Sequence, residues 1–388
     1  MTRTSDATAP DKPAFIDDLD LLRRRRTFKW QAGDGGPDRI CLGVAEMDLY
    51  APAFLRDALE RAVHLGELSY GLGQEQQEAC GRYLAAHHGA TVAASRCTTD
   101  VLTGLRAVLR LDLPPGSPVI VETPVYGDLF TVIEEAGHTP LPVPLLRDTR
   151  GYRHDWAALA EAARAGARGW ILCQPHNPVG RAWTAEEQAR AVALTLEHDL
   201  LLLANEVHLP LGLTGQPRSA FADPAVHMAW CYGFTSASKA FNIAGLKSAT
   251  IYASDRSAHS LTAMPQSLIG RPGSLGAIAT VACYDQGTQW LRVLRDVLAE
   301  RVQQVRDELA TLPLAVESVV PDSTYLVWAE FPHGDDARRL AGALATSDVH
   351  LLPGPAFGGA DYAHCFRINA AAHPEVLREA FARIRATL

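Results

Sequence analysis

The sequence lacks several features that would restrict its class at once. No stretch approaches the roughly 18 consecutive apolar residues that a membrane-spanning helix needs. The polar N-terminal stretch MTRTSDATAPDKPAF has no apolar core of the kind that a signal peptide carries. Basic residues are also fewer than acidic residues, so the net charge is −8 at pH 7. These absences predict a soluble chain whose main partner is neither a membrane nor a nucleic acid.

The cysteines argue against a disulfide framework. There are seven, an odd number, and they are widely spaced without any C-x-x-C motif. Several lie inside apolar runs such as WILCQP and MAWCYGF, where buried free thiols are expected. We therefore expect a reducing cytoplasmic location, and we predict no metal site. With 388 residues, the chain is long enough for one large and one smaller domain.

Between about residues 50 and 285, short apolar runs alternate with amphipathic helical segments. The runs are apolar throughout, which predicts strands buried on both faces of a mostly parallel sheet. The predicted strands are 118–123, 139–144, 169–174, 200–205, 228–234 and 248–253. Residues 274–312 read as one or two helices that lead into a second, α+β layer. In an open parallel sheet a ligand lies at the carboxyl ends of the strands, so the polar residues there are the site candidates.

Two of these candidates suit covalent and polar chemistry. Lys239 follows a predicted strand among small and hydroxyl residues. A buried lysine has a lowered pKa and can condense with an aldehyde, whereas a surface lysine in a loop would have no such role. Asn177 lies in QPHNPVG directly after another strand. It either aims its amide at a ligand or forms part of a plain turn.

Three further candidates suit ligand binding. Tyr126 could stack on a planar ligand or belong to the core. Asp100 precedes an amphipathic helix whose free N–H groups can bind phosphate, but it is also a good helix N-cap. Arg367 lies in an apolar strand, and a half-buried arginine pairs either with a protein carboxylate or with that of a substrate.

Together and in order, the motifs RTFKW, GVAEMDLYAP, SYGLGQ, TPVYGDLF, QPHNPVGRAW, NEVH, TSASKAFNIAGL, DSTYLVW and FRINAA resemble a known family. The chain resembles the fold-type I pyridoxal 5'-phosphate (PLP) enzymes of aminotransferase class I/II over nearly its whole length. The MD of AEMD and the FN after Lys239 favour the cystathionine β-lyase-like C–S lyase branch. The resemblance implies an α/β fold with a mostly parallel, seven-stranded central sheet. It places the large PLP-binding domain at 49–288, with residues 1–48 and 289–388 in a smaller α+β domain.

The resemblance also implies roles for the site candidates. Lys239 would bond to the cofactor aldehyde and shuttle protons, while Tyr126 would stack on the cofactor ring. Asn177 would hydrogen-bond the phenolic oxygen of the ring, and His208 lies where the family has a residue near that same oxygen. Arg367, with Asn177, would bind the α-carboxylate of an amino-acid substrate.

The phosphate of the cofactor would be held by a separate group of residues. These are the backbone N–H groups of Val101 and Leu102, the hydroxyls of Ser236 and Ser238, Lys247, and the partner subunit's Tyr70. The last of these implies a homodimer with shared active sites.

The chief departure from the family is Asn205 of the NEVH motif, where the family normally has an aspartate beside the ring nitrogen. A neutral amide can donate or accept a hydrogen bond there but supplies no charge. Glu206 would reach the same place only through a bulge, because adjacent strand residues point to opposite faces. The site is therefore either degenerate and inactive, or active with a changed preference among the reactions that PLP supports. A weaker electron sink disfavours transamination more than elimination.

The resemblance leaves several functions open. The leading one is α,β-elimination of L-cysteine S-conjugates to thiol, pyruvate and ammonia by a C–S β-lyase. A relative from antibiotic biosynthesis, of the lincosamide type, would instead couple decarboxylation of an S-cysteinyl intermediate to oxidative deamination. Two more functions are compatible with the motifs, namely an aminotransferase and a PLP-binding regulatory protein without turnover.

Overall fold

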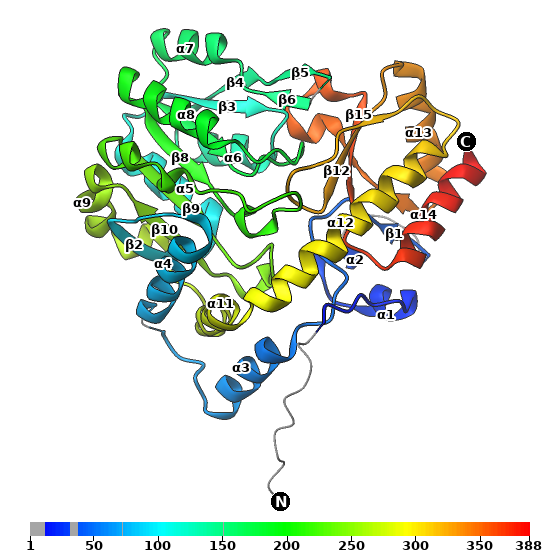
Figure 1. Ribbon diagram of the computed structural model, residues 1–388, viewed down its shortest axis with the longest axis horizontal. Helices are drawn as coiled ribbons and strands as arrows, with labels where there is room; N and C mark the ends of the chain where they lie inside the picture. The colour runs from blue at the N-terminus through cyan, green and yellow to red at the C-terminus, as the bar shows by residue number, and fades with distance from the viewer. Residues whose placement is uncertain (1–11, 32–37, 72, 150) are drawn as a thin grey trace, which may run out of the picture.

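The computed structural model describes residues 12–31, 38–71, 73–149 and 151–388. Its large part is built on a seven-stranded sheet with the strand order β2-β10-β9-β8-β7-β3-β4 (Figure 1). Within this sheet, β10 runs antiparallel to both of its neighbours, while the other described pairings are parallel. The predicted mostly parallel α/β fold is therefore confirmed. The strands are β2 Ala94–Thr98, β3 Pro118–Thr123, β4 Thr139–Pro144, β7 Gly169–Cys173, β8 Leu201–Asn205, β9 Cys231–Thr235 and β10 Ala249–Ala253.

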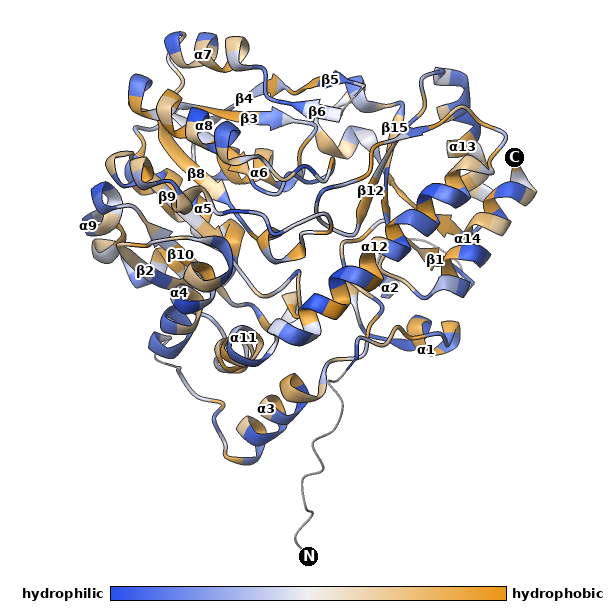
Figure 2. Ribbon diagram, viewed as in Figure 1, coloured by the Kyte–Doolittle hydropathy of each residue, from blue (hydrophilic) through white to orange (hydrophobic). Residues whose placement is uncertain are grey.

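Helices cover both faces of this sheet, as the continuous apolar strands require. In β8, Leu201 and Leu203 join one hydrophobic cluster, while Leu202 and Ala204 join the cluster on the opposite face. The helices that pack on the Leu201 face are α5 Val101–Asp112, α6 Asp128–Glu135, α9 Asp255–Ala263 and α10 Gln266–Ile269. Those on the opposite face are α4 Gln74–His88, α7 Trp156–Arg164, α8 Ala185–His198 and α11 Ser274–Gln286. Figure 2 shows β8 and β9 as largely hydrophobic between these layers.

Three details of the strand prediction were wrong. The strand that was predicted at 228–234 begins only at Cys231, because its first predicted residue belongs to a 3-10 helix, Pro224–Met228. The polar strand β2 was missed, since its sequence ASRCT carries no apolar run. The strand β4 was expected to be buried on both faces, but it is an edge strand with several exposed or half-buried residues. Its alternating prolines lack N–H donors and are tolerated at an edge.

The segment 274–312 forms two helices. Its sequence was compatible with either one helix or two. The second is α12 Thr288–Ala310, and it lies against the smaller part of the molecule in Figure 1. Gly287 stands between the two helices. A Cβ atom there would lie 2.4 Å from the Cys283 carbonyl oxygen and 2.4 Å from the Phe241 ring, so the close packing at this junction needs glycine.

The smaller part combines the chain end with residues from the beginning. Its strands are β1 Ile40–Cys41, β11 Glu317–Ser318, β12 Leu326–Glu330, β13 Val349–His350, β14 Leu352–Pro353 and β15 Cys365–Asn369. Its helices include α1 Leu19–Arg24, α2 Phe28–Gln31, α13 Gly334–Thr346 and α14 Pro374–Thr387. β1 pairs in parallel with β13, and Ile16 and Leu22 share a core cluster with Phe381. The helix α3 Ala53–His64 packs against α11, and the short strands β5 Leu146–Asp148 and β6 Gly151–Arg153 pair with each other.

The division of the chain at residues 48 and 288 stays a prediction, and its first eleven residues lie outside the described ranges. All seven cysteines are buried and free, as expected. Over the described ranges, no helix is both long enough and apolar enough to cross a membrane.

Candidate active site

Lys239 lies in the turn that follows β9, at the carboxyl end of the parallel strands. Its side chain is half-buried, and its Nζ donates a hydrogen bond of 3.1 Å to the carbonyl oxygen of Ala45. Burial, together with the nearby positive charge of Arg367, lowers the pKa of Lys239 to about 8. An amine with this pKa is partly unprotonated near neutral pH and can act as a nucleophile. Lys239 is therefore not a solvated loop lysine.

Arg367 lies in the middle of β15 with 3% of its surface exposed. Its Nη1 donates to the side-chain oxygen of Asn177 at 3.1 Å, and its Nη2 donates to the carbonyl oxygen of Gly43 at 2.7 Å. Within the described residues, no carboxylate forms an ion pair with this guanidinium, and its Nε has no partner. Burial lowers the pKa of Arg367 to about 10. A buried cation without a counter-charge is costly, so it favours an acidic ligand.

Tyr126 and Asn177 are joined through their backbones. The Tyr126 N–H donates to the Asn177 carbonyl at 3.1 Å, which fixes the two strand-end loops together. The Tyr126 hydroxyl donates to the carboxylate of Asp128. Burial and this carboxylate raise the pKa of Tyr126 far above its ordinary value, so the hydroxyl stays protonated.

His208 is 3% exposed and follows the end of β8. Burial, with the charges of Lys239 and Arg367, lowers the pKa of His208 to about 3, so the imidazole is neutral. Its Nδ1 is buried and finds no hydrogen-bond partner among the described residues. Buried polar atoms are normally paired, so this nitrogen is a candidate to bind a polar atom of a ligand.

The residues that are expected to hold the cofactor phosphate lie at the beginning of α5. Asp100 caps this helix, because its carboxylate accepts from the Thr103 N–H at 2.8 Å. The N–H groups of Val101 and Leu102 precede the first intrahelical bond and remain available. Lys247 reaches the same helix end, with Nζ 3.2 Å from the Asp100 carboxylate. The structure thus brings Val101, Leu102 and Lys247 together.

The two serines lie in the turn that carries Lys239. The Ser236 hydroxyl donates to the Ser248 carbonyl at 2.6 Å and accepts from the Ser238 N–H at 3.1 Å. These bonds hold the turn that carries Lys239 next to the chain segment at Lys247. A hydroxyl that donates once can still accept a second bond, but a phosphate contact for either serine stays a prediction.

Asn205 and Glu206 take different surroundings at the end of β8. The Asn205 side-chain oxygen accepts from the Val207 N–H at 3.4 Å. The Glu206 carboxylate accepts from Ser219 Oγ at 2.7 Å and from the Ala220 N–H at 2.6 Å, and Tyr252 also donates to it. These partners lie on the face of the sheet opposite the Asn205 side chain. The expectation that Glu206 does not enter the site without a bulge is confirmed.

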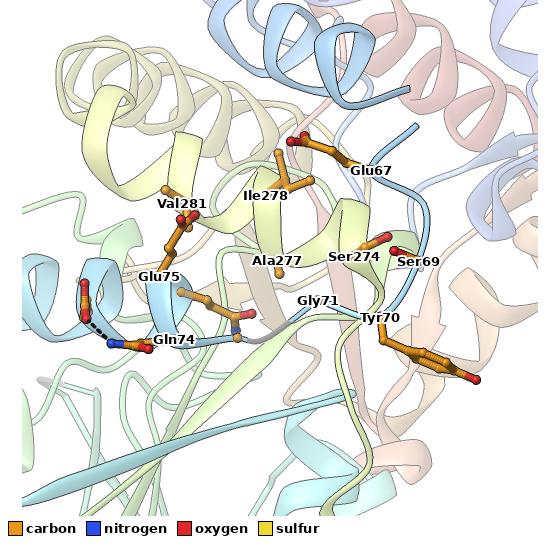
Figure 3. Close-up of a pocket in the computed structure, with 13 residues that line it drawn as sticks. Glu67, Ser69, Tyr70, Gly71, Gln74, Glu75, Ser274, Ala277, Ile278 and Val281 are labelled. Atoms are coloured by element: carbon orange, nitrogen blue, oxygen red, sulfur yellow. Dashed lines mark hydrogen bonds between the residues drawn. The ribbon is translucent and has the colours of Figure 1, made fainter. Parts of the chain in front are cut away.

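Tyr70 is separate from the residues described so far. Its side chain is 94% exposed, and Figure 3 shows it pointing away from a hollow of about 540 Å³. Residues of the segment around Tyr70 line one side of this hollow, and Ser274, Ala277 and Ile278 of α11 line the other. Leu72, which belongs to the same motif, lies outside the described ranges. Within its own chain Tyr70 makes little contact.

Sequence reasoning missed several groups at the site. Backbone carbonyls of Gly43 and Ala45 accept from the two site cations, and the Tyr325 hydroxyl also donates to Ala45 at 3.1 Å. Asp128 was missed as the partner of Tyr126. The motifs AEMD and DSTYLVW marked the neighbourhood, but a backbone carbonyl has no signature in sequence.

The assembled donors fit PLP. A lysine with a lowered pKa suits the aldehyde, and a helix N-terminus with a lysine beside it suits the phosphate. The Nδ1 of His208, which lacks a partner in the described part of the chain, suits an oxygen on the ring. The buried guanidinium of Arg367 suits the carboxylate of an amino acid.

Residues 56–384 match the family model described as Aminotransferase class I and II. The chain belongs to this family. A Mycobacterium tuberculosis protein named "Putative cystathionine beta-lyase" is 33% identical, with 95% of this chain and 94% of that protein covered. The Bacillus subtilis protein named cystathionine beta-lyase PatB is 29% identical, with 94% and 97% covered.

A solved structure agrees with these relatives. The Corynebacterium diphtheriae protein described as a "putative plp-dependent beta-cystathionase" superposes with a TM-score of 0.88 at 27% identity, with 96% of this chain and 98% of that chain covered. The family, the PLP fold type I and a PLP-dependent enzyme, as predicted, are confirmed. The individual roles of the site residues stay predictions.

Proposed function

We propose that this protein is a C–S β-lyase that acts on S-substituted L-cysteines by α,β-elimination. The products are a thiol, pyruvate and ammonia. The proposal is supported by the relatives named cystathionine beta-lyase, which match most of the chain. It is also supported by the motifs shared with the C–S lyase branch.

The observation that carries the proposal is the pair of cations at the site. Arg367 is buried, no carboxylate of the described ranges pairs with it, and Lys239 lies close enough to be affected by its charge. An amino acid that binds its α-carboxylate to Arg367 would place its Cα near the lysine amine. This arrangement suits chemistry at Cα of an amino acid.

Each residue then has a defined task. When bound, PLP supplies an electron sink that acidifies the Cα hydrogen of the substrate. Lys239 would hold the cofactor through its aldehyde, and its amine would take the proton from Cα of the substrate. The C–S bond breaks with both electrons on sulfur, which leaves as the thiolate. Hydrolysis of the remaining three-carbon fragment gives pyruvate and ammonia. Asn177 and Tyr126 would hold the cofactor, and Arg367 would orient the substrate through its carboxylate.

Asn205 favours elimination over transamination. Its side-chain oxygen already accepts from the Val207 N–H, so its NH₂ group can donate toward the cofactor nitrogen. A donor supports an unprotonated nitrogen and supplies no negative charge. A thiolate leaving group carries electrons away quickly and tolerates this weaker sink. Transamination needs the sink for longer and is disfavoured.

The proposed functional unit is a homodimer in a reducing cytoplasm. The segment from the end of α3 to Tyr70 exposes several large apolar side chains: Val63 at 54%, Leu65 at 61%, Leu68 at 57% and Tyr70 at 94%. Such a patch is unusual on a free monomer and suits a subunit interface. Across it, Tyr70 would reach the phosphate of the neighbouring site. The seven buried free thiols support the compartment.

The test combines spectroscopy and product analysis. The wild-type protein, loaded with PLP, is given a panel of S-substituted cysteines that includes a bulky conjugate, and the products are identified by mass spectrometry. Pyruvate and thiol in equal amounts are expected. Release of CO₂ with oxygen consumption, or a requirement for a 2-oxo acid, would replace the lyase by an oxidative decarboxylase or an aminotransferase.

Lys239→Ala is the matching variant. It is expected to lose the absorbance that borohydride abolishes in the wild type, together with at least about a thousandfold in pyruvate release. Lys247→Ala, which changes a lysine outside the proposed covalent bond, should keep the borohydride-sensitive absorbance. Covalent PLP in Lys239→Ala would contradict the assignment.

A further inference from the structure

Residues 43–48 form a segment that has no regular secondary structure, yet all six of its carbonyl oxygens accept hydrogen bonds. Two of them accept from the site cations: Gly43 from Arg367 at 2.7 Å and Ala45 from Lys239 at 3.1 Å. The remaining carbonyls are held as follows: Val44 and Glu46 by Asn369 Nδ2 at 2.6 Å each, Met47 by Asn242 Nδ2 at 2.7 Å, and Asp48 by the Ile16 N–H at 2.8 Å.

One end of this segment is anchored by a buried ion pair. The Nζ of Lys29 lies 2.7 Å from the Asp48 carboxylate, and both side chains are 1% exposed. The indole N–H of Trp30 donates to the other oxygen of that carboxylate at 2.8 Å. The RTFKW and AEMD motifs therefore meet here. Their contact fixes the segment to the N-terminal helix α2.

Asn242 anchors the segment on the side of the catalytic lysine. Its side-chain oxygen accepts from the Met47 N–H at 2.8 Å, and its NH₂ donates to the Met47 carbonyl at 2.7 Å. An amide that satisfies both backbone groups of one residue fixes that residue in position and orientation. Asn242 has φ of +58°, in the left-handed region where asparagine is tolerated better than most residues. It stands three residues after Lys239 in the same turn.

We propose that Asn242 is a positioning residue that ties the turn of Lys239 to residues 43–48, so that the carbonyls of Gly43 and Ala45 aim Arg367 and Lys239 at the substrate. The proposal rests on the proposed function, because it takes Arg367 as the carboxylate-binding group. The geometry supports a chain of contacts. Asn242 fixes Met47, Met47 fixes the path of the segment, and the segment presents two carbonyls that are two residues apart.

The consequence concerns substrate binding more than folding. Gly43 and Asn177 both accept hydrogen bonds from Arg367, and they hold the guanidinium from two sides. If the segment shifts, the guanidinium loses one of these supports and can turn away from an incoming carboxylate. The remaining anchors at Lys29 and Asn369 still hold the segment in the fold. A variant at Asn242 is therefore expected to fold while binding its ligand less well.

The test uses the PLP-loaded full-length protein and 2-methylalanine, an amino acid that has a carboxylate but no Cα hydrogen. Its dissociation constant is read from the change in cofactor absorbance. Asn242→Gly removes both bonds to Met47 without straining the positive φ, and we expect the dissociation constant to rise about tenfold. Asn242→Asp keeps an acceptor for the Met47 N–H and loses the donor, and an intermediate rise of about threefold is expected.

Thr184→Ala is the control. It removes the N-cap of α8, a bond of 3.2 Å between the Glu187 N–H and the threonine hydroxyl that involves neither Asn242 nor residues 43–48, and it is expected to lower stability only. Thermal unfolding is measured for all three variants. An unchanged dissociation constant in Asn242→Gly, or an equal rise in Thr184→Ala, would overturn the positioning role. Failure of wild-type lyase turnover, with 2-methylalanine still bound, would overturn the proposed function and leave this test valid.

Discussion

Asn205 and Glu206 are neighbours in the chain, but their side chains lie on opposite faces of the central sheet. Asn205 follows Leu201 and Leu203 at the two-residue spacing of strand β8, so its side chain lies on the face where α5 packs. Glu206 shares the opposite face, where Tyr252 and Ser219 donate to it. The carboxylate of Glu206 is thus held in the core, and it lies away from the face that carries Asn205. This separation allows the two positions to be tested independently.

Asn205→Asp should change the cofactor and the balance of products. A carboxylate favours a protonated ring nitrogen, because a charge-assisted hydrogen bond is about twice as strong as a neutral one. We expect the pH dependence of the cofactor absorbance to shift and the ratio of transamination to elimination to rise about tenfold. Absorption spectra across pH and product analysis with a 2-oxo acid measure both effects. An identical spectrum and product ratio would remove the argument from the ring nitrogen.

Glu206 should make the folded state less stable as the pH rises. Burial raises the pKa of Glu206 from its ordinary 4.5 to about 7. Between these values the unfolded chain loses this proton while the folded chain retains it, so stability falls with rising pH through that window. The loss is about 3 kcal/mol when complete.

The matched variant for this effect is Glu206→Gln. It cannot ionise, so its stability should decline less between pH 4.5 and 7 than that of the wild type. Urea unfolding at about pH 5 and about pH 8, on either side of most of this window, measures the difference. Because the side chain lies away from the site, the cofactor spectrum of this variant should resemble that of the wild type. Parallel pH profiles for both proteins would show that the carboxyl group does not titrate in this range.

Arg367→Lys should weaken substrate binding. A lysine is a point charge and cannot donate in a planar fork to Gly43, Asn177 and a substrate carboxylate together. Loss of about 2 kcal/mol corresponds to a KM about thirtyfold higher. Steady-state kinetics with an S-substituted cysteine measure the change. Arg256→Lys, at an exposed ion pair with Asp199, is the control and should leave KM unaltered; a normal KM in Arg367→Lys would place the carboxylate elsewhere.

Leu68→Asp should separate the proposed homodimer. Leu68 is 57% exposed and lies in the apolar patch that ends at Tyr70. A charge buried at an interface without a partner is strongly unfavourable. Sedimentation velocity is expected to show a monomer, with weaker retention of PLP. Leu196→Asp, on the exposed side of α8 at 39%, should remain a dimer. A wild-type monomer, or a stable Leu68→Asp dimer, would refute this interface.

Much of the fold was predictable because the central strands are buried on both faces. The limits of β3 and β4 match the predicted ranges, since apolar residues and turn residues mark both ends. The polar strand β2 was not predictable, because its pairing with β10 rather than its own composition makes it a strand. The exposure of β4 depends on its place at the sheet edge, which a local pattern does not record.

The candidate site divides in the same way. Lys239, Asn177 and Arg367 stand out in sequence because their side chains carry the chemistry and follow or occupy recognisable strands. That no carboxylate of the described ranges pairs with Arg367 depends on tertiary packing, as does the turn of Glu206 into the core. The supporting carbonyls of residues 43–48 belong to the backbone, and any sequence supplies them.

That backbone support has a consequence for the effects of amino-acid replacement. The acceptors that hold Arg367 and Lys239 at Gly43 and Ala45 cannot be deleted by changing a side chain, because every residue type has a carbonyl group. Single mutations within the segment keep these carbonyls but can still displace them. A Cβ atom at Gly43 would lie 2.8 Å from the His350 ring, and loss of the Asp48 carboxylate would leave Lys29 without its buried partner. The other weak points are the side chains that hold the segment from outside, namely Asn242 and Asn369, so variation in substrate preference is expected to arise at those neighbours.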